Sequence, residues 1–310
     1  MGPSWDRCVK GLAEFVMRGP VNAGAVAAGT LLLGLIVAPF AWLSAAVIAL
    51  VALRLGGLAT LRVAAPALAG VALAGVFVTG QGVAIAVSGL AAWLPAIVLA
   101  LVLRQRVRLD DALLVACAIG FALVLGTHLF VEDPTGLWRD LLYRIMPPET
   151  MAARFDLPAE AVRRMIDTMA PLMTGMVSMS VVFSAVTSLL LARWWQSLLY
   201  NPGGFGNEFR ALRLGRTAAA VTVGVTALAL FTTPAWIDSL ALVVAAVYVF
   251  QGLAVAHGLA KGLELGPGWL VALYIALVPL MPYVVVGLMI VGAVDAWADY
   301  RRRVQPGGNG

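Results

Sequence analysis

Polar side chains that could bind a ligand or move a proton fall in three short stretches of the second half of the chain. The longest stretch runs from 201 to 216 and reads NPGGFGNEFRALRLGR. The second stretch supplies three candidates for contact with a ligand, namely Tyr248, Gln251 and His257. The third holds Asp295 and Asp299. Phenol, amide, imidazole and carboxylate groups exchange hydrogen bonds or protons with polar ligands, so these stretches are where chemistry is expected.

The 201–216 stretch has the composition of a shaped loop. Pro202 followed by Gly203 predicts a type II turn, because Pro fixes the first central φ and Gly accepts a positive φ at the second. Residues 208–216 can then form a short interfacial helix with its arginines on the cytoplasmic side. A plain connection does not need so much glycine and aromatic detail, although arginines beside anionic headgroups are ordinary.

Asp295 is expected to reach the same membrane boundary as this loop. It lies on the last apolar stretch, where Gly292 and Ala296 form a small-xxx-small pair that permits close helix packing. A carboxylate at that depth needs a cation, and we predict Arg210 as its partner, while Asp299 can pair with Arg302 or Arg303 on its own helix. The simpler interpretation is that this ion pair only stabilises the fold and belongs to no functional site. The candidate inner-face site consists of Asn201, Gly203, Gly204, Glu208, Phe209, Arg210, Asp295 and Asp299.

Gln251 lies near the middle of an apolar stretch, where an amide without a partner is costly. It either clamps two helices together by hydrogen bonds or contacts a ligand, and we favour the clamp. Tyr248 precedes it by one helical turn on the same face and suits either role.

No catalytic motif occurs, neither HExxH, GxSxG, a P-loop nor GxGxxG. His128 and His257 are the only histidines, and Cys8 and Cys117 lie far apart without a second half of a metal site. We therefore expect no enzyme, no cofactor and no metal site.

The composition is that of a membrane protein. Of 310 residues, 62% are hydrophobic and 12% are charged, and the mean hydropathy is +0.94. A soluble chain needs roughly a quarter of its residues charged. The net charge of +5 needs no polyanion, since the cations gather at the ends of apolar runs. Nucleic-acid binding, a disulfide scaffold and a cytosolic enzyme are excluded.

The elements that must position the polar stretches are apolar helices. The sequence predicts an all-α, polytopic integral membrane helical bundle of about 8–10 segments. Two short couples are joined through prolines, 21–55 at Pro39 and 267–298 at Pro279 and Pro282, as hairpins that cross fully or stay shallow. The candidate spans are 21–38, 41–55, 64–79, 83–103, 111–131, 169–192, 217–235, 239–260, 267–280 and 283–298.

The distribution of cations predicts the orientation. With ten crossings and a cytoplasmic N-terminus, 16 of the 21 Lys and Arg fall inside. The five outside are Arg139, Arg144, Arg154, Arg163 and Arg164. Lys and Arg concentrate on the cytoplasmic side of membrane proteins, so both ends of the chain are expected to be cytoplasmic.

The same reading divides the chain into five parts. An interfacial amphipathic helix occupies 1–20, and an extracytoplasmic amphipathic connector of two short helices occupies 132–168. A basic disordered tail is expected at 300–310. Between them lie the two halves of the membrane bundle, 21–131 and 169–299, the second including the inner loop 196–216.

Four motifs carry a resemblance to a known family. They are the 201–216 loop, FQGLAVAH at 250–257, GAVDAWADYRR at 292–302 and ALVALRLG at 49–56. With these, the chain resembles the YybS-like family of predicted bacterial membrane proteins, a family of unknown function. The resemblance covers most of the chain and implies a multi-pass protein of the bacterial inner membrane.

Three functions are compatible with the sequence. The first is a small-molecule binding or permease-like component that relies on a partner for energy, because no ionisable residue lies in the middle of a span. The second is a non-transporting scaffold or assembly factor that docks a cytoplasmic or membrane protein through the 201–216 loop. The third, a lipid-modifying enzyme, would need Asp295 and Glu208 to face each other across a boundary cleft. Membrane lipids are expected partners of all three.

Overall fold

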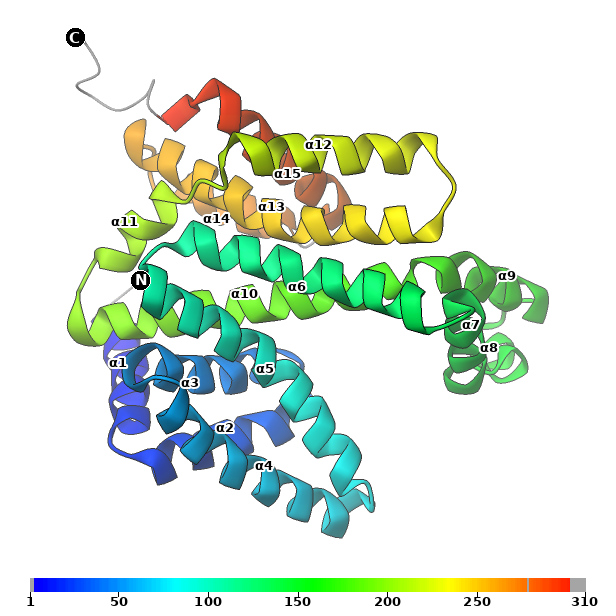
Figure 1. Cartoon of the computed structure of the whole chain (residues 1–310), viewed down its shortest axis with the longest axis horizontal. Helices are drawn as coiled ribbons and strands as arrows, with labels where there is room; N and C mark the ends of the chain where they lie inside the picture. Colours follow the sequence, from blue (N-terminus) through cyan, green and yellow to red (C-terminus); the bar gives the residue numbers. More distant parts are fainter. Residues whose placement is uncertain (1–2, 278, 302–310) are drawn as a thin grey trace.

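The computed structural model describes residues 3–277 and 279–301, and every regular element in these ranges is a helix (Figure 1). The predicted all-α membrane bundle is therefore confirmed. Each of the ten apolar stretches coincides with its own helix. Pro39 stands at the start of one of these helices and Pro282 near the start of another, where a missing N–H costs nothing.

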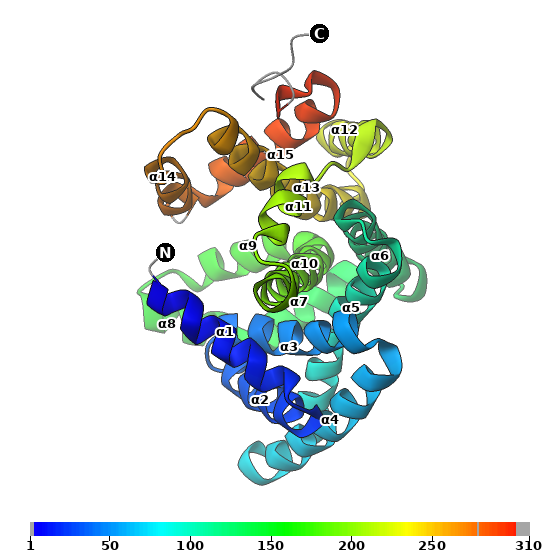
Figure 2. The same ribbon diagram turned by 90° about the vertical axis from the view of Figure 1, so that its left-hand side faces the viewer.

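Five helices make up the first part of the bundle: α1 (Pro3–Met17), α2 (Pro20–Gly34), α3 (Pro39–Leu55), α4 (Gly57–Thr79) and α5 (Gly82–Arg106). α1 turns into α2 through a bend of 120° at Gly19 and Pro20. Figure 2 shows α1 lying lengthwise across the end of the bundle, as expected for an interfacial helix.

α3 is the most enclosed helix of this part. Every residue from 44 to 53 is buried, because α2, α4, α5 and α10 (Met173–Tyr200) all pack against it. Its one polar group at depth is satisfied: the Ser44 hydroxyl donates to the Ala27 carbonyl at 2.7 Å and accepts from Trp93 Nε1 at 2.9 Å.

Two long helices join the first part to the second. α6 (Leu109–Phe130) and α10 each pack against α5 on one side and α13 (Ala235–Gly262) on the other. One continuous hydrophobic core runs from Ala13 in α1 to Ala296 near the end of the bundle. The two halves predicted from the sequence are thus one packed body.

The second part contains α11 (Gly204–Ala211), α12 (Gly215–Phe231), α13, α14 (Gly268–Leu277) and α15 (Met281–Ala298). α13 lies between α6 and α12 in Figure 1 and packs against both, and it also packs tightly against α15. α11, α1 and the end of α15 lie at one end of the bundle (Figure 1).

The opposite end carries a cap of three short helices, one more than predicted: α7 (Pro134–Ile145), α8 (Pro148–Phe155) and α9 (Ala159–Met169) (Figure 1). The cap has its own core, made of Leu142, Ala152, Val162, Ile166 and Ala170. Trp138 Nε1 donates to Thr174 Oγ1 at 2.8 Å and ties the cap to α10.

Six helices are long and apolar enough to cross a membrane, and up to eight if each bent pair counts as one span. The six are α4, α5, α6, the run Ala159–Tyr200, α13 and α15. α3 and α14 have 17 and 10 residues, fewer than the roughly 20 that span a bilayer. The structure thus supports a count at the lower end of the predicted range.

Candidate functional site

The 201–216 loop begins with the predicted type II turn. Gly203 has φ +83° and ψ −14°, and the Gly204 N–H donates to the Asn201 carbonyl oxygen at 3.0 Å. Only a residue without Cβ adopts this φ at little cost. The turn lets the chain leave α10 and enter α11 directly.

The predicted helix at 208–216 is wrong in its bounds. α11 begins at Gly204 and ends at Ala211; Leu212 is extended with ψ 124°, and α12 begins at Gly215 with φ +85°. The short helix α11 and the 17-residue α12, with a bend of 56° between them, replace the predicted helix. The helix breaks here because side chains from elsewhere bind the backbone groups of residues 210–214.

Two side chains supply those bonds. Arg301 Nη1 donates to the carbonyl oxygens of Arg210 and Leu212 at 2.6 and 2.9 Å. Gln251 Oε1 accepts from the Leu214 N–H at 2.9 Å. Buried backbone groups need hydrogen-bond partners, so these bonds stabilise the break in place of the missing helical hydrogen bonds.

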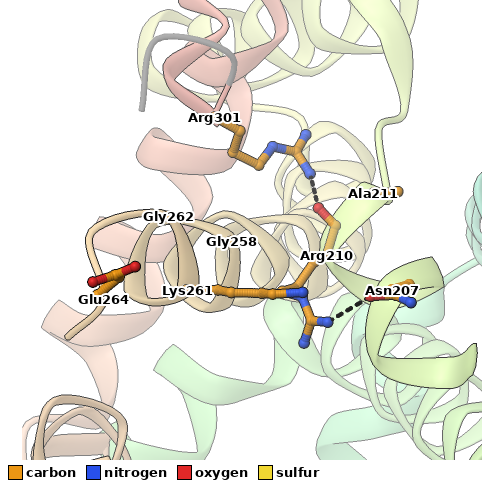
Figure 3. Close-up of a pocket in the computed structure, with 8 residues that line it drawn as sticks. All are labelled: Asn207, Arg210, Ala211, Gly258, Lys261, Gly262, Glu264 and Arg301. Atoms are coloured by element: carbon orange, nitrogen blue, oxygen red, sulfur yellow. Dashed lines mark hydrogen bonds between the residues drawn. The ribbon is translucent and has the colours of Figure 1, made fainter. Parts of the chain in front are cut away.

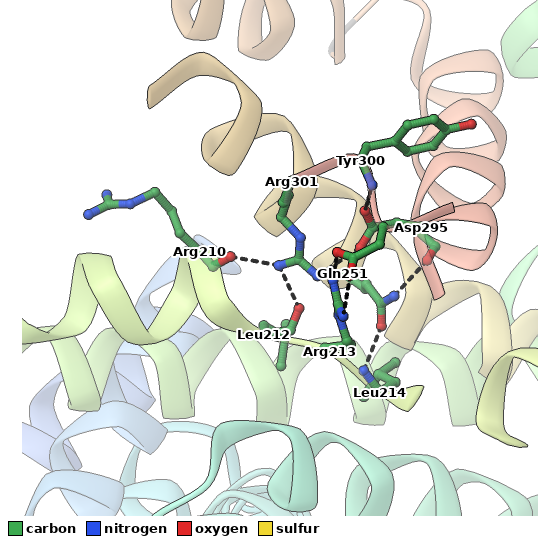
Figure 4. Close-up of polar contacts among 10 residues, drawn as sticks. Arg210, Leu212, Arg213, Leu214, Gln251, Asp295, Tyr300 and Arg301 are labelled. Atoms are coloured by element: carbon green, nitrogen blue, oxygen red, sulfur yellow. Dashed lines mark hydrogen bonds and ion pairs between the residues drawn. The ribbon is translucent and has the colours of Figure 1, made fainter. Parts of the chain in front are cut away.

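Asp295 is fully buried, and its partner is Arg301 instead of the predicted Arg210 (Figure 4). Arg301 Nη2 donates to Asp295 Oδ2 at 2.8 Å, and the Tyr300 N–H donates to Oδ1 at 3.1 Å. The Arg210 side chain turns away and donates to Asn207 Oδ1 at 2.8 Å. Arg210 enters the cluster only through its carbonyl oxygen, because the Arg301 guanidinium lies between the two.

The predicted disordered tail at 300–310 is therefore wrong at its start. Arg301 is 8% exposed and belongs to the core of this cluster, while 302–310 lie outside the described residues. A buried carboxylate six residues earlier fixes the position of Arg301. A run of arginines at the end of the chain otherwise has the composition of a solvated tail.

Two further ion pairs tie the loop to the bundle. Arg213, between α11 and α12, pairs with both oxygens of Asp299, which ends α15. Arg302 and Arg303, the partners predicted for Asp299, lie outside the described residues. Glu208 of α11 pairs with Arg193 of α10, whose Nε donates to Glu208 Oε2 at 2.8 Å. Glu208 and Asp295 therefore face different arginines and form no common cleft.

Gln251 bridges two helices, as the clamp interpretation predicted. It is fully buried, and its Nε2 donates to the Gly292 carbonyl oxygen of α15 at 2.6 Å while its Oε1 holds Leu214. The helices meet closely here, since a Cβ on Gly252 would lie 2.1 Å from the Leu288 carbonyl oxygen. The small-residue packing face predicted around Gly292 is thus present.

A pocket of about 460 Å³ opens beside this cluster (Figure 3). Three cationic side chains line it, those of Arg210, Lys261 and Arg301, against one carboxylate, that of Glu264. Lys261 makes no ion pair among the described residues. The buried Arg301 Nε–H has no hydrogen-bond partner among them either. The pocket therefore has an excess of positive charge and free donors.

His257 joins an aromatic row next to the pocket. Its ring meets Phe209 edge to face at 5.5 Å and Tyr274 at 6.0 Å, and Phe209 stacks on Phe205 at 5.9 Å. Nδ1 lies 2.8 Å from the Leu253 carbonyl oxygen, so the ring is held by its own helix. His257 fixes α11 against α13 and does not line the pocket.

The structure gathers most of the predicted site residues at one end of the bundle but separates Tyr248 from them. Tyr248 lines a groove between α6 and α12. Sequence reasoning missed the contributions of Arg193, Arg213, Lys261 and Arg301. The available signal was charge balance, because each predicted carboxylate needed a cation. In the described part of the chain no group of His, Cys, Asp and Glu side chains could hold a metal ion.

No family model, curated protein or solved structure matches the chain, so its resemblance to the YybS-like family remains a prediction.

Proposed function

We propose that this membrane protein is a binding component that holds a small anionic molecule, bearing a phosphate or carboxylate, in the pocket beside Arg301. The excess of cations in this pocket carries the proposal. Lys261 supplies an ammonium without an ion pair, and Arg210 supplies a guanidinium bound only to an amide among the described residues. Such groups bind phosphate and carboxylate oxygens strongly where water is partly excluded.

Dependence on a partner for energy follows from the distribution of buried charge. Among the described residues, the buried charged side chains are Asp295 and Arg301, and they neutralise each other. An ion-coupled transporter normally carries an ionisable group at depth that binds its ion. We place the pocket on the cytoplasmic side of a bacterial inner membrane, with both ends of the chain on that side. The cation bias and the family resemblance support this placement.

A second candidate is a non-transporting scaffold, and one observation favours it. α11 has no buried residue, although it is held in place by Glu208 and by Arg301. A fixed helix at the membrane surface, with Asn207 and Ala211 exposed and its other residues half-buried, suits the docking of a protein partner. The pocket distinguishes the two proposals, because a scaffold has no need of its excess charge.

Anion-dependent stabilisation tests the binding function. The detergent-purified protein is heated with inorganic phosphate, pyrophosphate or citrate, against chloride at equal ionic strength. We expect a higher Tm with at least one anion, because ligands that bind the folded state stabilise it. Lys261→Gln should abolish the increase. The control Lys10→Gln alters an exposed lysine of α1 that pairs, within the described residues, with Glu14 alone, and it should keep the increase.

An equal response of the wild type and Lys261→Gln would refute the site. In a separate experiment, the same measurement is repeated in the presence of phosphatidylglycerol vesicles. If they suppress the response to soluble anions in the wild type, the phosphate that occupies the pocket belongs to a lipid headgroup.

A further inference from the structure

A lateral groove of about 370 Å³ lies along α13, at least ten residues before the part of that helix that lines the cationic pocket. α13 forms its floor with Val244, Val247 and Tyr248. α6 and α12 form its walls and pack against α13. The groove starts at Leu214, where α12 begins, and reaches Phe121 of α6 near the middle of the bundle.

Tyr248 gives this mostly apolar groove a buried hydroxyl, besides the hydroxyls of Thr217 and Thr222. Tyr248 is 2% exposed, and its hydroxyl has no hydrogen-bond partner of normal geometry among the described residues, although Thr222 lies nearby. A buried hydroxyl without a partner is costly, most of all where the surroundings are hydrocarbon. The groove therefore favours an occupant that brings a hydrogen-bond acceptor to Tyr248.

The dimensions of the groove fit one hydrocarbon chain. Its residues on α12, from Leu214 to Thr222, span about 12 Å at 1.5 Å per residue. One leaflet contributes about 15 Å of hydrocarbon. A volume of about 370 Å³ over this length gives a mean cross-section of about 30 Å². An α-helix about 10–12 Å across is too wide for it.

An exposed cation lies at the same end of the bundle as the mouth of the groove. Arg216 stands in the first turn of α12, on the opposite face of that helix from Leu214 and Ala218, which line the groove, and it is exposed. It makes no ion pair among the described residues. Gln251 lies level with the start of α12, because it binds the Leu214 N–H. Tyr248 lies one helical turn further into the membrane bundle than Gln251. One turn is about 5 Å, the offset expected between a phosphate and an ester carbonyl group below it.

We propose that this groove binds one ester-linked acyl chain of an anionic phospholipid from the leaflet on the α11 side. The Tyr248 hydroxyl donates to the ester carbonyl, the chain lies along Val244 and Val247, and the headgroup lies at the membrane boundary where α12 begins. This site is independent of the cationic pocket and of the function proposed for it.

Retention of defined lipids tests the proposal. The full chain in detergent receives phosphatidylglycerol with ester-linked chains or its ether-linked analogue, which lacks the carbonyl, and native mass spectrometry counts the bound lipid. We expect about threefold to tenfold more ester lipid, as one net hydrogen bond provides. Tyr248→Phe should remove this preference. Tyr283→Phe, at a tyrosine that is 79% exposed, should keep it.

A second variant tests the location. Ala218→Phe places a ring in the groove and should lower retention of both lipids while Tm stays near that of the wild type. Equal retention of ester and ether lipid by the wild type would overturn the proposal, as would an unchanged preference in Tyr248→Phe. Disulfide cross-linking of Val221→Cys between two copies would also overturn it, because the groove would then face a second copy.

Discussion

Arg301 joins two segments that are distant in the sequence, the loop after α11 and the end of α15. Its guanidinium pairs with Asp295 and also binds the carbonyl oxygens of Arg210 and Leu212. The loop and the last helix thus share one buried cation. A charged group this deeply buried is stable only while its partners remain, since removal of one leaves the other unpaired.

Arg301→Gln should therefore destabilise the protein by about 3–5 kcal/mol, the usual cost of breaking a buried ion pair. Asp295→Asn should cost a similar amount, and the double variant less than the sum, because the two residues act as a pair. Denaturant unfolding of the detergent-purified variants measures these values.

Arg210→Ala is the matched control, because among the described residues its side chain hydrogen-bonds only to Asn207, and its carbonyl oxygen is retained. It should cost well under 1 kcal/mol, as exposed polar contacts do. A loss as large as that of Arg301→Gln would restore Arg210 as the partner of Asp295.

Gln251→Leu should lower stability by about 0.6–2 kcal/mol, the range for a hydrogen bond between membrane helices. Leucine fills a similar volume but leaves the Leu214 N–H and the Gly292 carbonyl oxygen without their partner. Thermal unfolding and binding of the anions used above are measured together. Lost binding at unchanged stability would show that Gln251 contacts a ligand and does not act as a clamp.

The sequence predicted which polar residues matter better than it predicted their partners. A buried amide such as Gln251 needs two bonds wherever it lies, so the clamp follows from its position alone. The partner of Asp295 depends on where the chain turns after α15. Asp299 takes φ +49° there and reverses the chain so that Arg301 points inward. No rule based on residue spacing predicts that Arg301 points inward.

At the scale of elements, the crossing of α13 and α15 positions the site. Gly252 and Gly292 face each other's helix backbone, with the Cβ positions of both within 3 Å of main-chain atoms. This contact sets the depth at which Asp295 and Gln251 meet the loop.

Gly252→Ala should destabilise the protein by about 1–3 kcal/mol or more, because the methyl group forces the helices apart. Gly224→Ala is the control, since nothing lies within 4 Å of a Cβ at that position of α12. There alanine should raise stability by up to about 1 kcal/mol, as it does in helix interiors. If denaturant unfolding gave the same change in the free energy of unfolding for both substitutions, α13 and α15 would pack less closely than described above.

Helix positions could be predicted from apolar runs, but helix breaks could not. The break at 212–214 interrupts a stretch with good helix formers, since Gln251 and Arg301 bind its backbone groups. The three helices of the cap were predicted as two because α8, only eight residues long, gives no apolar pattern of its own.

At the scale of the whole molecule, α11 and the α7–α9 cap lie at opposite ends of the bundle. Cysteines introduced by Ala211→Cys and Thr150→Cys, both at exposed positions, should therefore react from opposite sides of the membrane. Ala211→Cys is expected to react only from the cytoplasm, in keeping with the cation bias. The native Cys8 and Cys117 are first replaced by serine and alanine.

Labelling of intact cells with an impermeant maleimide, before and after permeabilisation, measures the accessibility. Reaction of both positions from the same side would contradict the arrangement. Reaction of Ala211→Cys from outside alone would reverse the orientation while leaving the fold intact.

The enclosure of α3 has a consequence for synthesis. One wall around this helix is α10, which the ribosome reaches only after the residues from 56 to 172. At about 5–20 residues per second, that interval lasts about 6–23 s. During it, the α3 surface that will face α10 is covered by lipid or by a chaperone. Chains that terminate before α10 should therefore be early targets of membrane proteases, although they contain every other neighbour of α3.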